Sequence, residues 1–157
     1  MRSQKRLLYT MSGASLVWAG ILIGVSFLAT PAKFLAPSLT LSVALDVGRQ
    51  TFGVFSQIEI FFALALVVAA MLGRHQRGIQ ATTVVVAALV AVQVMWLLPV
   101  LDERVEIILD GGTPGESSLH TLYIVLESGK LLLLGLIAWT AHVAAVKISP
   151  ERVEYVR

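Results

Sequence analysis

The chain has 157 residues and a net charge of +2, with 57% hydrophobic and 14% charged residues. Because soluble domains average about 25% charged residues, this composition excludes an ordinary soluble globular domain, indicates lipid as the surrounding solvent and gives no basis for nucleic-acid binding. The absence of cysteine excludes disulfides, thiolate metal sites and cysteine nucleophiles.

A helix needs about 20 mostly apolar residues to cross a hydrocarbon core of about 30 Å. The first such stretch covers residues 7–30, follows a basic N-terminal run and ends at Pro31. It is longer than a usual signal-peptide core, so we predict a retained anchor, with cleavage as the alternative. Residues 31–50 mix charges with apolar side chains and predict a segment lying in the membrane interface.

The second predicted span covers residues 51–72 and the third covers residues 79–101, joined by a polar turn at residues 73–78. Residues 102–118 form a predicted outer polar loop rich in acidic residues. The fourth span covers residues 118–146, with the Ser118 hydroxyl as its expected cap and Pro150 beyond its end. The sequence therefore predicts a single transmembrane domain over residues 1–157 that forms an all-α, antiparallel four-helix bundle.

The charged residues of the connections predict the orientation of this bundle. Residues 1–6 carry a net charge of +3 and the turn at residues 73–78 carries +2, whereas residues 102–118 carry −4. Lys and Arg favour the cytoplasmic side of a membrane, so both termini are predicted to be cytoplasmic. The small size and short loops suggest a bacterial plasma (inner) membrane.

Ionisable side chains within a span cost about 2.5–3.5 kcal/mol on insertion scales, so each is a candidate for function. Counted from the outer boundary, Glu59, Gln93 and Glu127 each lie about eight residues, or about 12 Å, inside the membrane. His120, Tyr123, Glu127 and Lys130 share one side of the fourth helix. The sequence thus predicts a polar layer of Glu59, Gln93, Glu127 and Lys130, with His120 and Tyr123 at its entrance.

This layer allows a structural and a functional interpretation. In the first, Lys130 and Glu127 neutralise each other and only fix how the helices pack. In the second, Glu59, Gln93, Tyr123, Glu127 and Lys130 bind a small ligand, an ion or a redox cofactor that enters from the outer side.

The cofactor is left open by the sequence. His120, Glu59 and Glu127 could bind a divalent transition metal, although the Glu-x-x-His spacing of di-iron bundles is missing. Aromatic side chains near Glu59 could instead surround a quinone, a haem or a lipid tail; they are Phe52, Phe55, Phe61 and Phe62.

Residues 18–20 (WAG), 27–34 (FLATPAKF) and 48–52 (GRQTF) resemble the first half of a family of small four-span membrane proteins. This family includes the mammalian transmembrane protein 205-like proteins and a bacterial domain of unknown function. The resemblance covers about residues 13–65. It implies the four-span fold, and it assigns no catalytic residue.

No nucleotide-binding, zinc-protease or nucleophile-elbow motif is present in the sequence. Gly20 and Gly24 form a stripe of small residues that suits close helix contact within the chain or with a homo-oligomeric or other membrane-protein partner. Three interpretations therefore remain open: a ligand- or metal-dependent oxidoreductase, a small oligomeric transporter or channel, and a non-catalytic assembly partner of a membrane complex.

Overall fold

The computed structural model describes residues 2–73 and 77–148, and these residues form helices and connections with no strand. The centre of the predicted turn at residues 73–78 and the predicted stop at Pro150 lie outside the described residues. The elements in chain order are α1 (Arg2–Leu22), the π-helical segment η1 (Ile23–Ala29), α2 (Thr30–Lys33), α3 (Leu41–Leu72), α4 (Arg77–Val92), the π-helical segment η2 (Gln93–Leu97), α5 (Leu98–Leu109) and α6 (Leu119–Lys147). The predicted all-α class is confirmed.

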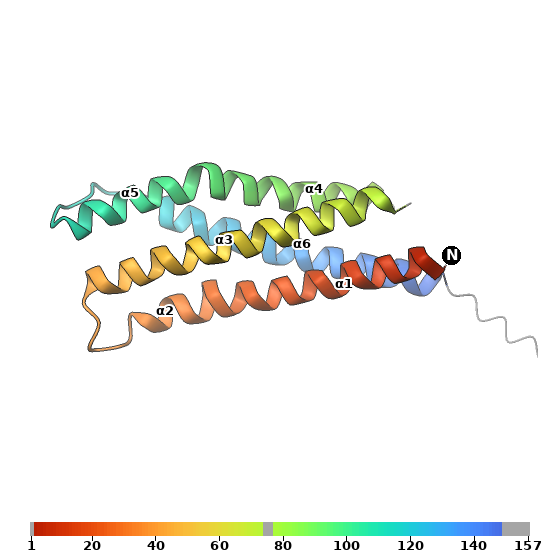
Figure 1. Ribbon diagram of the computed structural model, residues 1–157, viewed down its shortest axis with the longest axis horizontal. Helices are drawn as coiled ribbons and strands as arrows, with labels where there is room; N and C mark the ends of the chain where they lie inside the picture. The colour runs from red at the N-terminus through yellow and green to blue at the C-terminus, as the bar shows by residue number, and fades with distance from the viewer. Residues whose placement is uncertain (1, 74–76, 149–157) are drawn as a thin grey trace, which may run out of the picture.

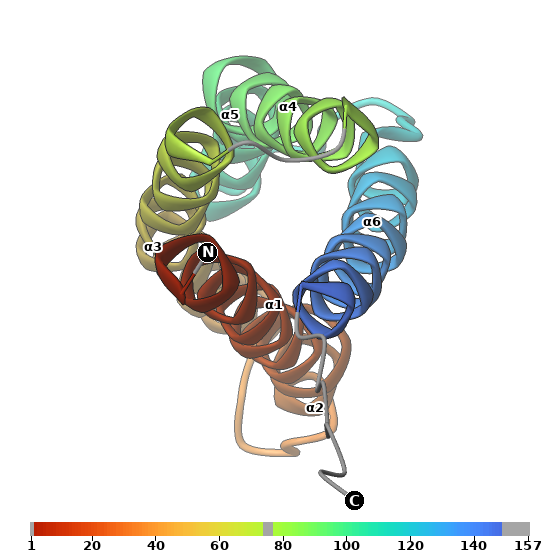
Figure 2. The same cartoon turned by 90° about the vertical axis from the view of Figure 1, so that its right-hand side faces the viewer.

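These elements combine into long helices because α1, η1 and α2 are continuous, as are α4, η2 and α5 (Figure 1). Viewed along the bundle, α1 lies next to α3 and α6, and α4 completes the ring between them (Figure 2). The start of α1, the end of α3 and the start of α4 lie at one end. We call the opposite end, which carries residues 34–40 and 110–118, the loop end.

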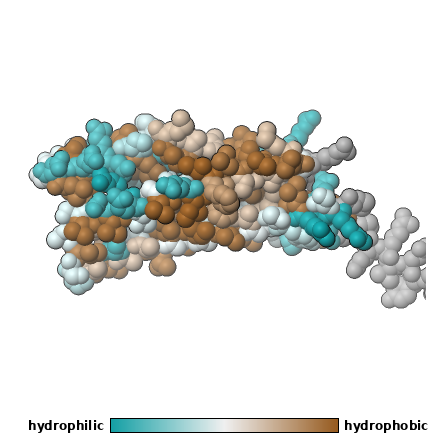
Figure 3. Space-filling model, in the orientation of Figure 1, coloured by the Kyte–Doolittle hydropathy of each residue, from teal (hydrophilic) through white to brown (hydrophobic). Residues whose placement is uncertain are grey.

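Four helices in the described part of the chain are long and apolar enough to cross a membrane: Arg2–Lys33, Leu41–Leu72, Arg77–Leu109 and Leu119–Lys147. Large apolar side chains on different helices point outward; Met71 is 79% exposed and Met95 is 80% exposed. In the face shown in Figure 3, hydrophobic residues cover most of the middle, and hydrophilic residues gather toward the two ends. A bundle stabilised in water would show the opposite pattern, with polar residues on its outer faces.

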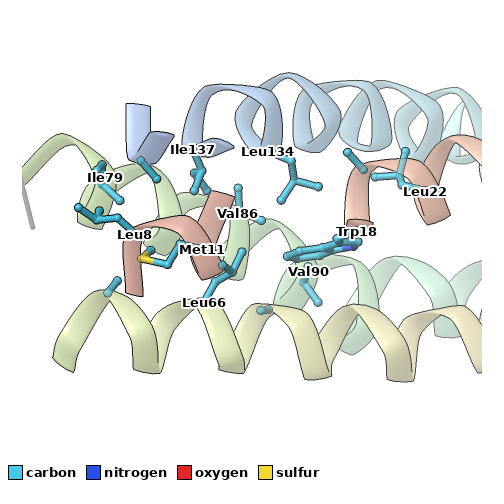
Figure 4. Close-up of a cluster of buried hydrophobic side chains, with 14 of the residues drawn as sticks. Leu8, Met11, Trp18, Leu22, Leu66, Ile79, Val86, Val90, Leu134 and Ile137 are labelled. Carbon is cyan, nitrogen blue, oxygen red and sulfur yellow. The ribbon is translucent and has the colours of Figure 1, made fainter. Parts of the chain in front are cut away.

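The apolar core occupies the half of the bundle away from the loop end. Leu8 and Met11 of α1 pack there with Leu66 of α3, Val86 of α4 and Ile137 of α6. Figure 4 shows these side chains converging on the space between the four helices. All five are at most 2% exposed, so this half of the interior is closed by packed side chains.

Three of the helices extend further than the hydrophobic spans predict. The first begins at Arg2 and continues past its predicted end at Pro31 to Lys33. Residues 41–50, predicted as part of an interfacial segment, belong to α3. The Thr40 side chain caps the start of this helix by accepting a hydrogen bond from the Val43 N–H. Residues 102–109, predicted as loop, continue α5 until Gly111, whose positive φ of 82° ends the helix. Charged side chains end a hydrophobic stretch without ending a helix, because helix formation depends on backbone propensity rather than on hydropathy.

One local prediction is wrong, and one loses an alternative. The Ser118 side chain makes no capping hydrogen bond; the Ser117 hydroxyl accepts one from the Leu119 N–H at 3.1 Å instead. Gly20 and Gly24 have no neighbouring atom within 4 Å of the place where a Cβ would lie, so they do not mediate close helix contact within the chain. Contact of this stripe with a partner stays a prediction.

Candidate functional site

Lys130 of α6 lies at the centre of a buried cluster of polar side chains. Its ammonium pairs with Glu59 of α3 and, at 2.6 Å, with Glu127 one turn earlier on α6. The Gln93 side-chain amide donates a hydrogen bond to Glu127 Oε1 at 2.9 Å. Each of these four residues is at most 2% exposed. The structure therefore brings together the four residues that the sequence predicts to share one layer.

The first helix adds two members that the sequence does not predict. The Trp18 indole N–H donates to Glu59 Oε1 at 3.3 Å, and the Ser26 hydroxyl donates to Glu127 Oε2 at 2.9 Å. Neither side chain is ionisable, so the energy of membrane insertion does not single them out. We call these six residues the polar layer: Trp18, Ser26, Glu59, Gln93, Glu127 and Lys130.

Both neutral partners of Glu127 are carried by π-helical segments. Ser26 lies within η1 and Gln93 begins η2. Each segment is followed two residues later by a proline, Pro31 or Pro99. Proline has no N–H and its ring clashes with the carbonyl four residues back, so a wider turn relieves both problems. Single π turns inside α-helices occur frequently at functional sites.

The charges of the layer are unequal. It contains two carboxyl groups and one ammonium, and the ammonium is shared between both carboxylates. The side-chain oxygen of Gln93 is buried without a hydrogen-bond partner in the part of the chain that the structure describes. A buried polar group of this kind is costly to leave unpaired, and the Ser15 hydroxyl oxygen on α1, outside the layer, lacks a partner among the described residues in the same way.

Two adjoining cavities, with volumes of about 250 and 280 Å³, lie between the polar layer and the loop end. One is lined by residues of α2, α3 and α5 near the loop end, and the other reaches Ser26 and Glu127. We call the two cavities together the vestibule. The residues that line both of them are Thr30, Phe34, Phe52, His120 and Tyr123.

Tyr123 lines both cavities, one helical turn before Glu127 on α6. It is 4% exposed, and its ring packs edge-on against Phe52 at a centroid distance of 5.0 Å. His120, three residues earlier on α6, is exposed and lines both cavities. Their arrangement agrees with the predicted order, in which both residues precede the layer.

The structure separates His120 from the predicted metal ligands. Across residues 2–73 and 77–148, no group of three His, Cys, Asp or Glu side chains is close enough to hold a metal ion. Glu59 and Glu127 share Lys130 instead. Of the four phenylalanines near Glu59, Phe52 alone lines the vestibule; Phe62 stacks on Trp18 at 5.8 Å, and Phe61 is 67% exposed.

The fold and site define an all-helical bundle with four helices long enough to cross a membrane and a buried charged layer beneath a vestibule. Comparison of the chain with family models, curated proteins and solved structures found no match. The resemblance to small four-span membrane proteins therefore stays a prediction from the sequence.

Proposed function

We propose that this chain is an integral membrane protein that binds a small, largely apolar molecule in the vestibule, above the polar layer. The observation that carries this proposal is the pair of adjoining cavities that ends at Glu127. Small-molecule sites are typically concave and mostly apolar, with a few convergent polar groups, and their volumes are about 300–1,000 Å³. The vestibule has this character, because Phe34 and Phe52 line it together with Thr30, His120 and Tyr123.

The packing supports binding rather than conduction through one copy of the chain. Beyond the polar layer, the interior is filled by the apolar core, in which Met11 and Ile137 are both 0% exposed. The buried polar side chains of this half, Ser12, Ser15 and Thr83, are uncharged, and the hydroxyls of Ser12 and Thr83 donate to backbone carbonyls. The vestibule therefore has the form of a binding site that is closed on the side of the apolar core, and not of a pore through the bundle.

The charge distribution supports an orientation in which the loop end faces outward and both termini are cytoplasmic. The acidic residues of the connection at residues 102–118 lie at the loop end, and Arg2, Lys5 and Arg6 lie at the other end. Because the chain has no cysteine, single cysteines report this directly. In intact bacterial cells, Ser38→Cys should react with an impermeant maleimide, and Ser3→Cys should react only after the cells are opened. The reverse result would contradict the orientation.

A pair of matched substitutions tests binding in the vestibule while the ligand is still unidentified. Thr30 lines both cavities and donates to the carbonyl of Val25 at 2.8 Å, whereas Thr82 donates to the carbonyl of Gly78 at 2.9 Å on a different helix and lines neither cavity. Thr30→Phe fills the vestibule, and Thr82→Phe adds the same bulk elsewhere.

We expect a small molecule to co-purify with the native chain and with Thr82→Phe, and to be lost from Thr30→Phe. Mass spectrometry of the extracted molecules gives its identity, and the absorption spectrum shows whether it is a haem or a quinone. A molecule that is retained equally by both variants would lie outside the vestibule. No molecule in any of the three proteins, even after purification in a mild detergent with added membrane lipid extract, would contradict the proposal.

A further inference from the structure

We infer that the ligand of the vestibule is an anionic amphiphile, whose acidic group pairs with Lys33 and whose apolar part enters from the lipid between η1 and α6. This inference rests on the proposed function and names the chemical class that the site would accept. It follows from three features: an ammonium without a carboxylate partner, an apolar lining and an opening on the side of the bundle.

The Lys33 ammonium lies where a ligand in the vestibule would meet it. Lys33 ends α2 and lines the cavity nearer the loop end. Its side chain reaches across to α3, where a Cβ added at Gly48 would collide with Lys33 Nζ. The ammonium also lies 5.0 Å from the centroid of the Phe34 ring. The glycine thus clears the space that holds this charge against α3.

Lys33 differs from the other cations that line the same cavity because they are engaged by the protein. Arg49 pairs with Glu106 at 3.0 Å and with Asp46 at 3.6 Å, and Arg104 donates to the carbonyl of Gly115. Lys33 makes no ion pair within the described residues.

Asp102, the acid that lines this cavity, makes no ion pair with Lys33 in the part of the chain that the structure describes. A partly buried ammonium without a carboxylate is a recognition point for an anion, because charge-assisted hydrogen bonds are about twice as strong as neutral ones.

The second cavity gives the ligand its apolar part and its route of entry. It lies between η1, α2 and α6, and it is lined by Phe27, Pro31 and Ile124 among others. Phe27 is 38% exposed and Ile124 is 44% exposed, so the residues that line this cavity also reach the outer side of the bundle. In a membrane this side faces lipid, so an amphiphile would enter along the bilayer rather than from water.

The distance between Lys33 and Glu127 keeps the acidic group of the ligand away from the buried carboxylates of the polar layer. Lys33 follows Ser26, the partner of Glu127, by about seven residues, which corresponds to about 10 Å along a helix. An acid at Lys33 therefore avoids close repulsion by Glu127, while the apolar chain of the ligand lies in the second cavity beside Phe27 and Ile124. The shared chemistry is an anionic head on an apolar chain, whether the head is a carboxylate or the phosphate of a lipid.

The test compares three probes with one chain length: lauric acid, lauryl phosphate and lauryl alcohol. Their binding to the full chain in a neutral detergent is measured by native mass spectrometry on the native protein, Lys33→Met, Lys33→Arg and Thr30→Phe. We expect the native protein to prefer an acidic probe over the alcohol by about tenfold, because hydrogen bonds to charged groups are worth this much or more. Lys33→Met should abolish the preference, Lys33→Arg should restore most of it, and Thr30→Phe should lower binding of all three probes.

The outcomes separate the inference from the proposed function. Equal binding of the acids and the alcohol, lost in Thr30→Phe, would overturn the inference and leave a vestibule that binds neutral molecules. A preference for acid that survives in Lys33→Met would also overturn it, since the charge would act elsewhere. Preference for lauric acid alone would assign a carboxylate head, and preference for lauryl phosphate alone would assign a phosphate head. No saturable binding of any probe would overturn the inference, whereas the proposed function is judged by the co-purified molecule.

Discussion

Replacement of Lys130 by methionine is expected to destabilise the bundle more than any other single change in the polar layer. Lys130 is 0% exposed and pairs with both Glu59 and Glu127. Its removal leaves two buried carboxyl groups close together without a cation. Breaking a buried ion pair by removing one partner costs about 3–5 kcal/mol, and here one ammonium serves two partners, so we expect about 4 kcal/mol or more.

The measurement is the free energy of unfolding in mixed micelles titrated with SDS and followed by circular dichroism. Lys147→Met is the matched control, because Lys147 lies on the same helix but is exposed. We expect the control to change stability by less than about 0.5 kcal/mol. A triple variant, Glu59→Gln with Glu127→Gln and Lys130→Met, removes all three charges and should recover most of the lost stability. A Lys130→Met cost below about 1 kcal/mol, or a triple variant no more stable than the single one, would refute the reasoning.

Three further predictions use the same unfolding and binding assays. Ser26→Ala should lower the free energy of unfolding by about 1.5 kcal/mol, because the Ser26 hydroxyl donates to a buried carboxylate. Ser128→Ala should leave it almost unchanged, because that exposed hydroxyl bonds only to its own helix, and equal losses in the two variants would contradict this. Trp18→Phe should cost about 2 kcal/mol through the lost indole hydrogen bond and the smaller side chain, and an unchanged free energy of unfolding would show that the contact is not maintained. Gly48→Ala should displace the Lys33 ammonium and reduce binding of lauric acid several-fold while stability stays nearly constant; unchanged acid binding would show that the ammonium acts from another position.

The sequence is sufficient to predict the four long helices and the contact between the buried polar residues of different helices. Hydropathy locates four apolar stretches, and the structure contains a helix over each of them. The equal depth of Glu59, Gln93 and Glu127 follows from residue counts alone. In the structure both carboxylates pair with Lys130, and Gln93 donates to Glu127. Such counting succeeds because rise per residue is nearly constant in a helix and buried charges must find partners.

The vestibule could not be predicted in the same way. Its shape depends on how far α2 and α6 lie apart at the loop end and on where residues 110–118 pack, and neither follows from periodicity. The π-helical segments carry a sequence cue in Pro31 and Pro99, since each proline follows the widened turn by two residues. Even so, proline more often bends a helix than widens it. The two prolines therefore indicate where a helix is irregular, but they do not predict a π-helical turn.

The position of the polar layer argues against a purely structural role. A buried ion pair is commonly no more stabilising than well-packed apolar residues of similar volume, and the other half of this bundle is packed with such residues. Two helices nevertheless carry π-helical turns that present Ser26 and Gln93 to Glu127, and Gln93 still has a buried oxygen without a partner among the described residues. The layer lies directly beneath the cavity that reaches Glu127. Ser26 and Glu127, two members of this layer, line that cavity, and their placement supports our proposal that a molecule binds in the vestibule.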